Sequence, residues 1–267
     1  MGKKIVFCGG GNMAEGVLRS LLNREVAKAE DITVSEIFEP RCAYLKETYG
    51  VVAAPDVTEA MKDADMFIVA VLPKHVPIVT KTIKEMKKAD AIVLSIAAGV
   101  TIAKLEEQVG EDAKVVRVMP NTLNQSGNGH SAACVNGNID EEDKVWVTAV
   151  LDSLGQTMYI EESMFGAFTA FSCSGPMWIY ELADALIDAG VYVGFSRRDA
   201  KNIVLKNILG AGMVLDMTGE APKEKLDEMC SPGGVTIEGF KALHDDGFPS
   251  AVMTSVKKAV DKANGIK

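Results

Sequence analysis

The sequence lacks the paired cysteines, long apolar runs and excess of positive charge that mark several classes of protein. Its five cysteines, an odd number, are scattered without a C-x-x-C pair, which argues against a disulfide framework and a zinc site. We therefore expect reduced thiols, no bound metal and a cytoplasmic location. Lys and Arg total 28 against 37 Asp and Glu, and the net charge of −9 predicts no nucleic-acid partner, because it repels a phosphate backbone.

Membrane and secretion signals are also missing. The apolar run at residues 5–8, which follows two lysines, is shorter than the roughly 7–15 residues of a secretory segment. No uninterrupted apolar stretch reaches the ~18 residues of a membrane-spanning helix, so we expect no membrane partner. Glycine is plentiful, with 24 residues, and several of them lie where predicted strands end or predicted helices begin.

Two patterns divide the 267 residues. In the first half, short apolar runs alternate with helical periodicity, which is typical of βαβ units and a parallel sheet. The second half keeps only helical patterns, so we predict an α/β domain at residues 1–160 and an all-helical domain at residues 161–267. The predicted strands are 3–8, 32–35, 66–72, 92–96 and 114–118, and the predicted helical tracts are 12–23, 40–49, 163–194, 197–217, 226–229, 235–244 and 249–263.

A nucleotide-binding motif directly follows the first predicted strand. Gly9, Gly11 and Ala14 form G-x-G-x-x-A, with Asn12 and Met13 between them, and the motif opens a helix. Gly9 permits the tight turn, Gly11 lets a pyrophosphate approach, and Ala14 allows close helix–strand packing. The helix N-terminus offers unpaired N–H groups to phosphate. We therefore predict that residues 1–160 form a Rossmann-like NAD(P)-binding domain.

The ends of three further strands extend this predicted cofactor site. Ser35 and Glu36 end the second strand, where an acid would bond a ribose hydroxyl, so the local sequence favours NAD(H), although Ser35 and Arg41 could serve the extra phosphate of NADP(H). The small residues after the later strands leave room for a cofactor, or simply pack closely against helices. The residues at these later strand ends are Ala70, Leu72, Pro73, Ala97, Ala98 and Gly99.

Two glycine-containing segments in the helical half predict a second binding site. Ser172-Cys173-Ser174-Gly175-Pro176 interrupts a long helical tract, and Ser231-Pro232-Gly233-Gly234-Val235-Thr236 opens another helix. Gly-Pro within a helical tract costs several kcal/mol, so a compensating role is expected. Helices that restart near Pro176 and Thr236 present free N–H groups, and two such starts facing one another could hold a carboxylate.

These motifs together resemble the pyrroline-5-carboxylate reductase family. GGGNMA, AVLPK, SIAAGV, RVMPNT, the SGP turn before ELADALIDAGVYVGFSR, and SPGGVTIEGF recur in the family's order and spacing, from Ile5 to about Val260. The resemblance implies an NAD(P)-dependent oxidoreductase that passes hydride to the C=N bond of a cyclic imine and forms L-proline, the last step of proline biosynthesis. It also implies a homodimer or larger homo-oligomer that assembles through the helical domain.

The resemblance further assigns roles to individual residues. The substrate carboxylate is expected at Ser174, Gly175, Gly233, Gly234, Val235 and Thr236. Thr236 would lie near the ring nitrogen and position it or assist its protonation. Asn121, with Pro120, would line the meeting point of nicotinamide and imine, so Thr236 and Asn121 are the expected catalytic residues.

Alternatives remain open at this point. The usual family residues differ at Cys173, Met177 and Trp178, beside the expected pocket, which would either shift the substrate range or only repack the helix. One rival function is a related imine reductase with another cyclic substrate. A non-catalytic nucleotide-binding sensor is a second, although it would not need the intact SGP and GGVT segments. A related 3-hydroxy-acid dehydrogenase would need a lysine in residues 164–194, which contain none.

Overall fold

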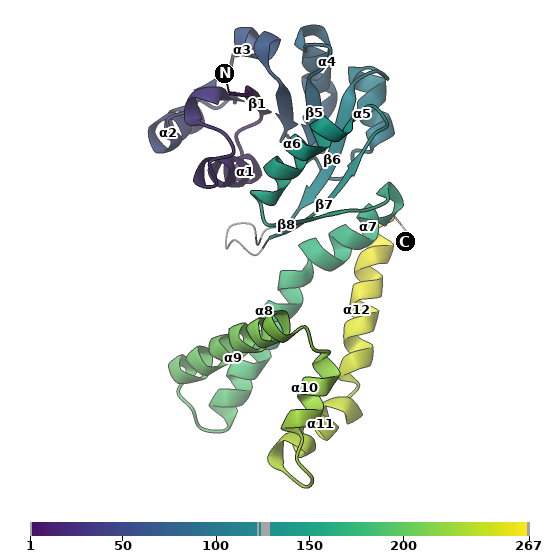
Figure 1. The fold of residues 1–267 in the computed structure, drawn as a ribbon. Helices are drawn as coiled ribbons and strands as arrows, with labels where there is room; N and C mark the ends of the chain where they lie inside the picture. Colours follow the sequence, from purple (N-terminus) through teal and green to yellow (C-terminus); the bar gives the residue numbers. More distant parts are fainter. Residues whose placement is uncertain (1, 122, 124–128, 266–267) are drawn as a thin grey trace. The chain divides into compact units, whose positions relative to one another are not determined.

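The computed structural model describes residues 2–121, 123 and 129–265. Its contacts divide the chain into two compact units, Met1–Phe168 and Thr169–Lys267. The first unit holds the whole sheet and the helices around it, and the second is helical, as the sequence predicted (Figure 1). The domain boundary between residues 160 and 161 stays a prediction.

The first unit is built on one eight-stranded sheet with the order β3-β2-β1-β4-β5-β6-β7-β8. Strands β1 to β6 pair in parallel, β7 runs antiparallel to β6, and β8 pairs in parallel with β7. All five predicted strands are confirmed, but the sheet is not wholly parallel, and β3, β7 and β8 were not predicted. The strands are β1 (Ile5–Cys8), β2 (Ile32–Ser35), β3 (Val52–Ala54), β4 (Met66–Val69), β5 (Ile92–Ser95), β6 (Lys114–Pro120), β7 (His130–Val135) and β8 (Gln156–Tyr159).

Helices cover both faces of this sheet and create two apolar cores. Along β1, Ile5 and Phe7 belong to one core while Val6 and Cys8 belong to the other, because successive side chains of a strand point to opposite faces. This burial on both faces explains the continuous apolar runs in the sequence. The α-helices are α1 (Asn12–Asn23), α2 (Glu39–Tyr49), α3 (Thr58–Asp63), α4 (Val76–Met86), α5 (Ile102–Val109), α6 (Glu141–Asp152) and α7 (Phe165–Phe168), with short 3-10 turns η1 (Ala29–Asp31), η2 (Pro73–His75) and η4 (Glu162–Met164).

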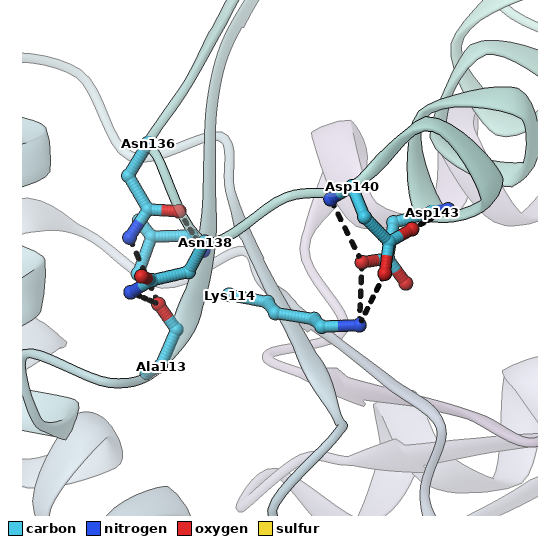
Figure 2. Close-up of polar contacts among 7 residues, drawn as sticks. Ala113, Lys114, Asn136, Asn138, Asp140 and Asp143 are labelled. Atoms are coloured by element: carbon cyan, nitrogen blue, oxygen red, sulfur yellow. Dashed lines mark hydrogen bonds and ion pairs between the residues drawn. The ribbon is translucent and has the colours of Figure 1, made fainter.

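A buried asparagine organises the chain where β7 ends. Asn136 Nδ2 donates to the Ala113 carbonyl at 2.8 Å (Figure 2). Nδ2 also donates to Glu106 Oε1 at 2.8 Å, and Oδ1 accepts from the Val115 amide at 3.1 Å. These bonds satisfy backbone groups at the start of β6 that the antiparallel β7 leaves unpaired. Asn136 therefore stabilises the antiparallel pairing of β6 with β7.

The second unit consists of helices that follow the predicted tracts closely. Helix α8 begins directly after Ser174, α9 ends directly before Gly219, which has φ of 67°, and α11 begins directly after Gly234. The indole Nε1 of Trp178, in α8, donates to Ser255 Oγ in α12 at 2.8 Å. The elements are a π-helical turn η5 (Thr169–Cys173), α8 (Gly175–Tyr192), α9 (Arg197–Thr218), α10 (Pro222–Met229), α11 (Val235–Asp245) and α12 (Phe248–Ala263).

The helical unit buries little of its own apolar surface. Helices α8, α10, α11 and α12 contain no buried residue, and α9 contains two, Ala200 and Val204. Large apolar side chains stand exposed along these helices, among them Tyr192, Leu209 and Met213. Over the described residues, no helix combines the length and apolar character that crossing a membrane would require.

Candidate active site

The carboxyl ends of three parallel strands bring the predicted cofactor segments to one edge of the sheet. Register pairs Cys8 at the end of β1 with Val69 at the end of β4, and Val69 with Ser95 at the end of β5. The segments that begin at Gly9, Ala70 and Ala97 therefore leave the sheet side by side. Ligands of open α/β sheets bind outside this edge.

The glycine loop after β1 has the backbone geometry that the motif predicted. Gly9 adopts φ of +102°, and a Cβ there would lie 2.9 Å from both the Ala70 carbonyl oxygen and Val71 Cγ1. Gly11 is the N-cap of α1, and no side chain caps the helix. A Cβ on Gly11 would meet no atom within 4 Å, so the space above the helix N-terminus is open to a ligand. Exposed N–H groups at such a terminus suit a phosphate.

A cavity of about 500 Å³ lies against this loop. Six of the predicted cofactor residues line it: Gly9, Gly11, Ser35, Glu36, Ala70 and Leu72. Its other walls were not predicted: they come from the ends of β1 and β2, from α3, and from the stretch that runs from the end of β4 into α4. The lining residues that the sequence reasoning missed are Cys8, Ile37, Met61, Val71, His75, Ile78, Val79 and Thr82. The mainly apolar walls with a few polar groups are typical of a small-molecule site.

A second hollow of about 410 Å³ adjoins the same loop near Gly11, Asn12 and Arg41. Glu36 lines both hollows. Its Oε2 accepts from the Gly10 amide at 2.9 Å and its Oε1 from the Phe38 amide at 2.9 Å. The carboxylate predicted to meet a ribose is therefore held in place by backbone groups.

The remaining predicted cofactor residues lie near this edge in varied environments. Met13 is partly exposed on α1, Pro73 opens η2, and Ala97 is buried while Ala98 and Gly99 are exposed. Asn121, after β6, is 5% exposed, and its Oδ1 accepts from the amides of Leu123 and His130. Asn121 therefore bonds backbone amides on the far side of β6; its neighbour Thr122, in the RVMPNT motif, lies outside the described residues.

The predicted substrate segments both lie in the helical unit, at helix starts as expected. Ser174 immediately precedes α8, which begins at Gly175, while Gly233 has φ of +67° and Gly234 is the N-cap of α11. Val235 and Thr236 occupy the first turn of α11 and are exposed. Figure 1 draws the start of α8 and helix α11 in different parts of this unit, so a single copy does not bring the two segments together.

Two cysteines, one beside the glycine loop and one beside Ser174, are poor nucleophiles. Burial raises the pKa of Cys8 to about 12 and that of Cys173 to about 11. Both thiols therefore stay protonated at neutral pH, and a thiolate is the reactive form of cysteine. The arrangement favours chemistry supplied by a bound cofactor rather than by a side-chain nucleophile.

Both halves of the chain match models of known protein families. Residues 162–266 match the family model for pyrroline-5-carboxylate reductase dimerisation, and residues 4–99 match that for NADP oxidoreductase, coenzyme F420-dependent. The pyrroline-5-carboxylate reductase of Aquifex aeolicus is 37% identical over 260 residues, which cover 97% of this chain and 96% of that protein. The Escherichia coli enzyme is 32% identical and 98% of each chain is covered. The chain belongs to the pyrroline-5-carboxylate reductase family.

Solved structures agree with this family membership. Plasmodium falciparum pyrroline carboxylate reductase with NADP bound is 31% identical, with a TM-score of 0.85 and coverage of 99% of this chain and 98% of that one. The Coxiella burnetii reductase is 25% identical, with a TM-score of 0.92 and coverage of 100% and 99%. The resemblance that the sequence motifs predicted is therefore confirmed across the whole chain.

Proposed function

We propose that this chain is a pyrroline-5-carboxylate reductase, which transfers hydride from NAD(P)H to the C=N bond of 1-pyrroline-5-carboxylate and forms L-proline. The observation that carries this function is the full-length family match, at 30–37% identity over at least 96% of the chain, together with an open glycine loop against a 500 Å³ cavity. The reaction is the last step of proline biosynthesis.

The described residues fit a nicotinamide cofactor. Gly11 and the uncapped start of α1 would hold the pyrophosphate, with Asn12, Met13 and Ala14 in the same turn. Ser35 and Glu36 would meet the ribose at the end of β2. Ala70, Leu72, Pro73, Ala97, Ala98 and Gly99 would contact the cofactor along the strand ends. When bound, the nicotinamide supplies the hydride, so the protein's task is to bind and orient.

The helical unit would bind the imine. Two copies of the chain would bring together two helix starts, at which backbone groups of Ser174, Gly175, Gly233, Gly234 and Val235 would surround the substrate carboxylate. The Gly234 amide itself donates to the Ser231 carbonyl at 3.0 Å. Thr236 would position the ring nitrogen or assist its protonation, and Asn121 would line the place where the imine meets the nicotinamide. A protonated imine is already electrophilic, so alignment supplies much of the rate enhancement.

We also propose a preference for NADH over NADPH. The fixed carboxylate of Glu36 lines both hollows beside the glycine loop and would repel a phosphate on the adenosine ribose. Glu36→Gln removes this charge and is expected to raise kcat/KM for NADPH relative to NADH. A wild-type enzyme with much higher kcat/KM for NADPH would overturn the preference.

We propose a homodimer or larger homo-oligomer in the cytoplasm. The dimerisation model matched at residues 162–266 and the exposed apolar side chains of α8 to α12 support self-association through the helical unit. Five free cysteines suit a reducing compartment. Sedimentation velocity is expected to give at least twice the 28.5 kDa chain mass, and a monomer at micromolar concentration would contradict the assembly.

The deciding experiment is a reductase assay with the purified full-length chain. Pyrroline-5-carboxylate with NADH or NADPH is expected to give loss of absorbance at the nicotinamide band and formation of L-proline. Turnover of a different cyclic imine without turnover of this one would assign a related imine reductase instead. Binding of the cofactor without turnover of any imine would indicate a nucleotide sensor.

A further inference from the structure

Two oppositely charged side chains form hydrogen bonds with the backbone of Gly10, the middle glycine of the loop after β1. Glu36 Oε2 accepts from the Gly10 amide at 2.9 Å, while Arg41 Nε donates to the Gly10 carbonyl oxygen at 2.6 Å. Gly10 itself is buried, and a Cβ there would lie 2.9 Å from Leu45 Cδ1 and 3.2 Å from Glu36 Cβ. The peptide groups on both sides of Gly10 are therefore fixed by side chains from the end of β2 and from α2.

Arg41 is itself fixed by an ion pair with a residue of α1. Arg41 Nη2 forms an ion pair with Glu15 Oε2 at 2.5 Å, and both side chains are largely buried. Glu15 Oε1 accepts from the hydroxyls of Tyr44 at 2.9 Å and Tyr49 at 2.6 Å. The guanidinium also lies 5.0 Å from the Tyr44 ring centroid. This network, which we call the Arg41 clamp (Glu15, Arg41, Tyr44 and Tyr49), leaves Arg41 one orientation.

We propose that Arg41 and Glu15 are positioning residues of the cofactor site, which act on the pyrophosphate through the Gly10–Gly11 peptide. A planar peptide points its C=O and N–H in opposite directions, so fixing the Gly10 carbonyl also fixes the direction of the Gly11 N–H. The three consecutive glycines would otherwise sample many conformations and lose that freedom on binding. Arg41 removes much of this cost before the cofactor arrives.

This inference rests on the proposed cofactor site and differs from a direct role in binding phosphate. If Arg41 bound a phosphate on the adenosine ribose, removing Arg41 would weaken the binding of NADPH and leave the binding of NADH unchanged. A residue that orients the pyrophosphate loop acts on both cofactors alike. The two roles therefore separate in binding measurements alone.

The test measures dissociation constants of NADH and NADPH by nicotinamide fluorescence with the full-length chain. Arg41→Ala is expected to raise the dissociation constants of both cofactors about tenfold, because one charge-assisted hydrogen bond is lost. The KM for the cofactor should rise by a similar factor while kcat at saturation stays unchanged. Arg41→Lys, which keeps the charge but lacks the guanidinium fork, should recover little affinity. A loss confined to NADPH, or full affinity in Arg41→Lys, would overturn the proposal.

A double-mutant cycle tests whether Glu15 acts through Arg41. Glu15→Ala is expected to raise the dissociation constants of both cofactors about fivefold. The double variant should raise them about tenfold rather than ~fiftyfold, because the effects of coupled residues do not add. Additive losses would refute the coupling. Lys62→Ala, which breaks the exposed Lys62–Glu59 pair on α3, is the matched control and should leave both affinities unchanged. Thermal unfolding and far-UV circular dichroism identify any variant that fails to fold.

The same measurements keep this inference separate from the proposed reaction. A wild-type chain that binds NADH tightly but does not reduce pyrroline-5-carboxylate refutes the proposed substrate and leaves the Arg41 clamp to be judged by the binding data. If wild type turns over the imine but Arg41→Ala binds the cofactors with unchanged affinity, the proposed reaction stands and the positioning role of Arg41 is refuted.

Discussion

Replacing Asn136 with alanine tests how the antiparallel end of the sheet is stabilised. The substitution removes three side-chain hydrogen bonds, to Val115, Glu106 and Ala113. Val115 is fully buried, so its amide is left without a partner at a cost of about 1–3 kcal/mol. With the lost bonds to Glu106 and Ala113, we expect the free energy of unfolding to fall by about 3 kcal/mol. For a unit of this size that corresponds to roughly 6–12 °C in Tm.

The two tryptophans allow this loss to be assigned to the first unit. Trp146 lies on α6, packed against a core of the first unit, whereas Trp178 lies on α8 in the second. Urea unfolding followed by fluorescence in a Trp178→Phe background therefore reports on the first unit. Asn136 follows β7 beside Val115, at the edge of the sheet opposite the glycine loop. Cofactor affinity of the folded variant should consequently stay unchanged.

Asn138→Ala is the matched control for this prediction. Asn138 Nδ2 donates to the Glu111 carbonyl at 2.7 Å and to the same Ala113 carbonyl at 3.0 Å, but the side chain is exposed. Water can replace these bonds, so we expect a loss below about 1 kcal/mol. Equal losses in the two variants, or a loss below 1 kcal/mol in Asn136→Ala, would refute the reasoning that a buried unpaired amide dominates the cost.

Thr236, Glu162 and Glu15 offer three shorter tests. Thr236→Ala should lower kcat about tenfold without changing the Kd of NADH, and Thr236→Ser, which keeps the hydroxyl, should retain most activity; steady-state kinetics decide this. Glu162→Ala should lower the free energy of unfolding by about 2–3 kcal/mol, because Arg117 is 7% exposed and loses its ion pair at 2.9 Å; an unchanged urea midpoint would contradict this. Burial raises the pKa of Glu15, but hydrogen bonds from Tyr49, Arg41 and Tyr44 outweigh it and hold the pKa below 4.5. The stability that Glu15 adds is therefore complete above about pH 4.5 and lost as the pH falls through its folded-state pKa, so the difference between wild type and Glu15→Gln should shrink in acid unfolding.

Local patterns were enough to predict many elements of the fold. Helix α1 and strand β2 have the predicted bounds, because a period of 3.6 or a short buried run is visible within about ten residues. Strands β7 and β8 were missed, since His130–Val135 and Gln156–Tyr159 carry little β-branched apolar content. Their pairing with β6 and with one another comes from distant contacts, which no local pattern reports.

The sequence by itself determined the two-part organisation, the cofactor motif and the family. This was possible because the glycines at strand ends and helix starts belong to short motifs that can be recognised without a structure. Only the tertiary structure decided what the side chains around those motifs do. Glu36 looked like a free ribose ligand, yet its oxygens accept from the Gly10 and Phe38 amides. Arg41 looked like an alternative phosphate ligand, yet it donates to Gly10 from 31 residues away and pairs with Glu15. The physical reason is that hydrogen bonds join atoms close in space, and parallel strands separated by helices bring together residues that the sequence keeps far apart.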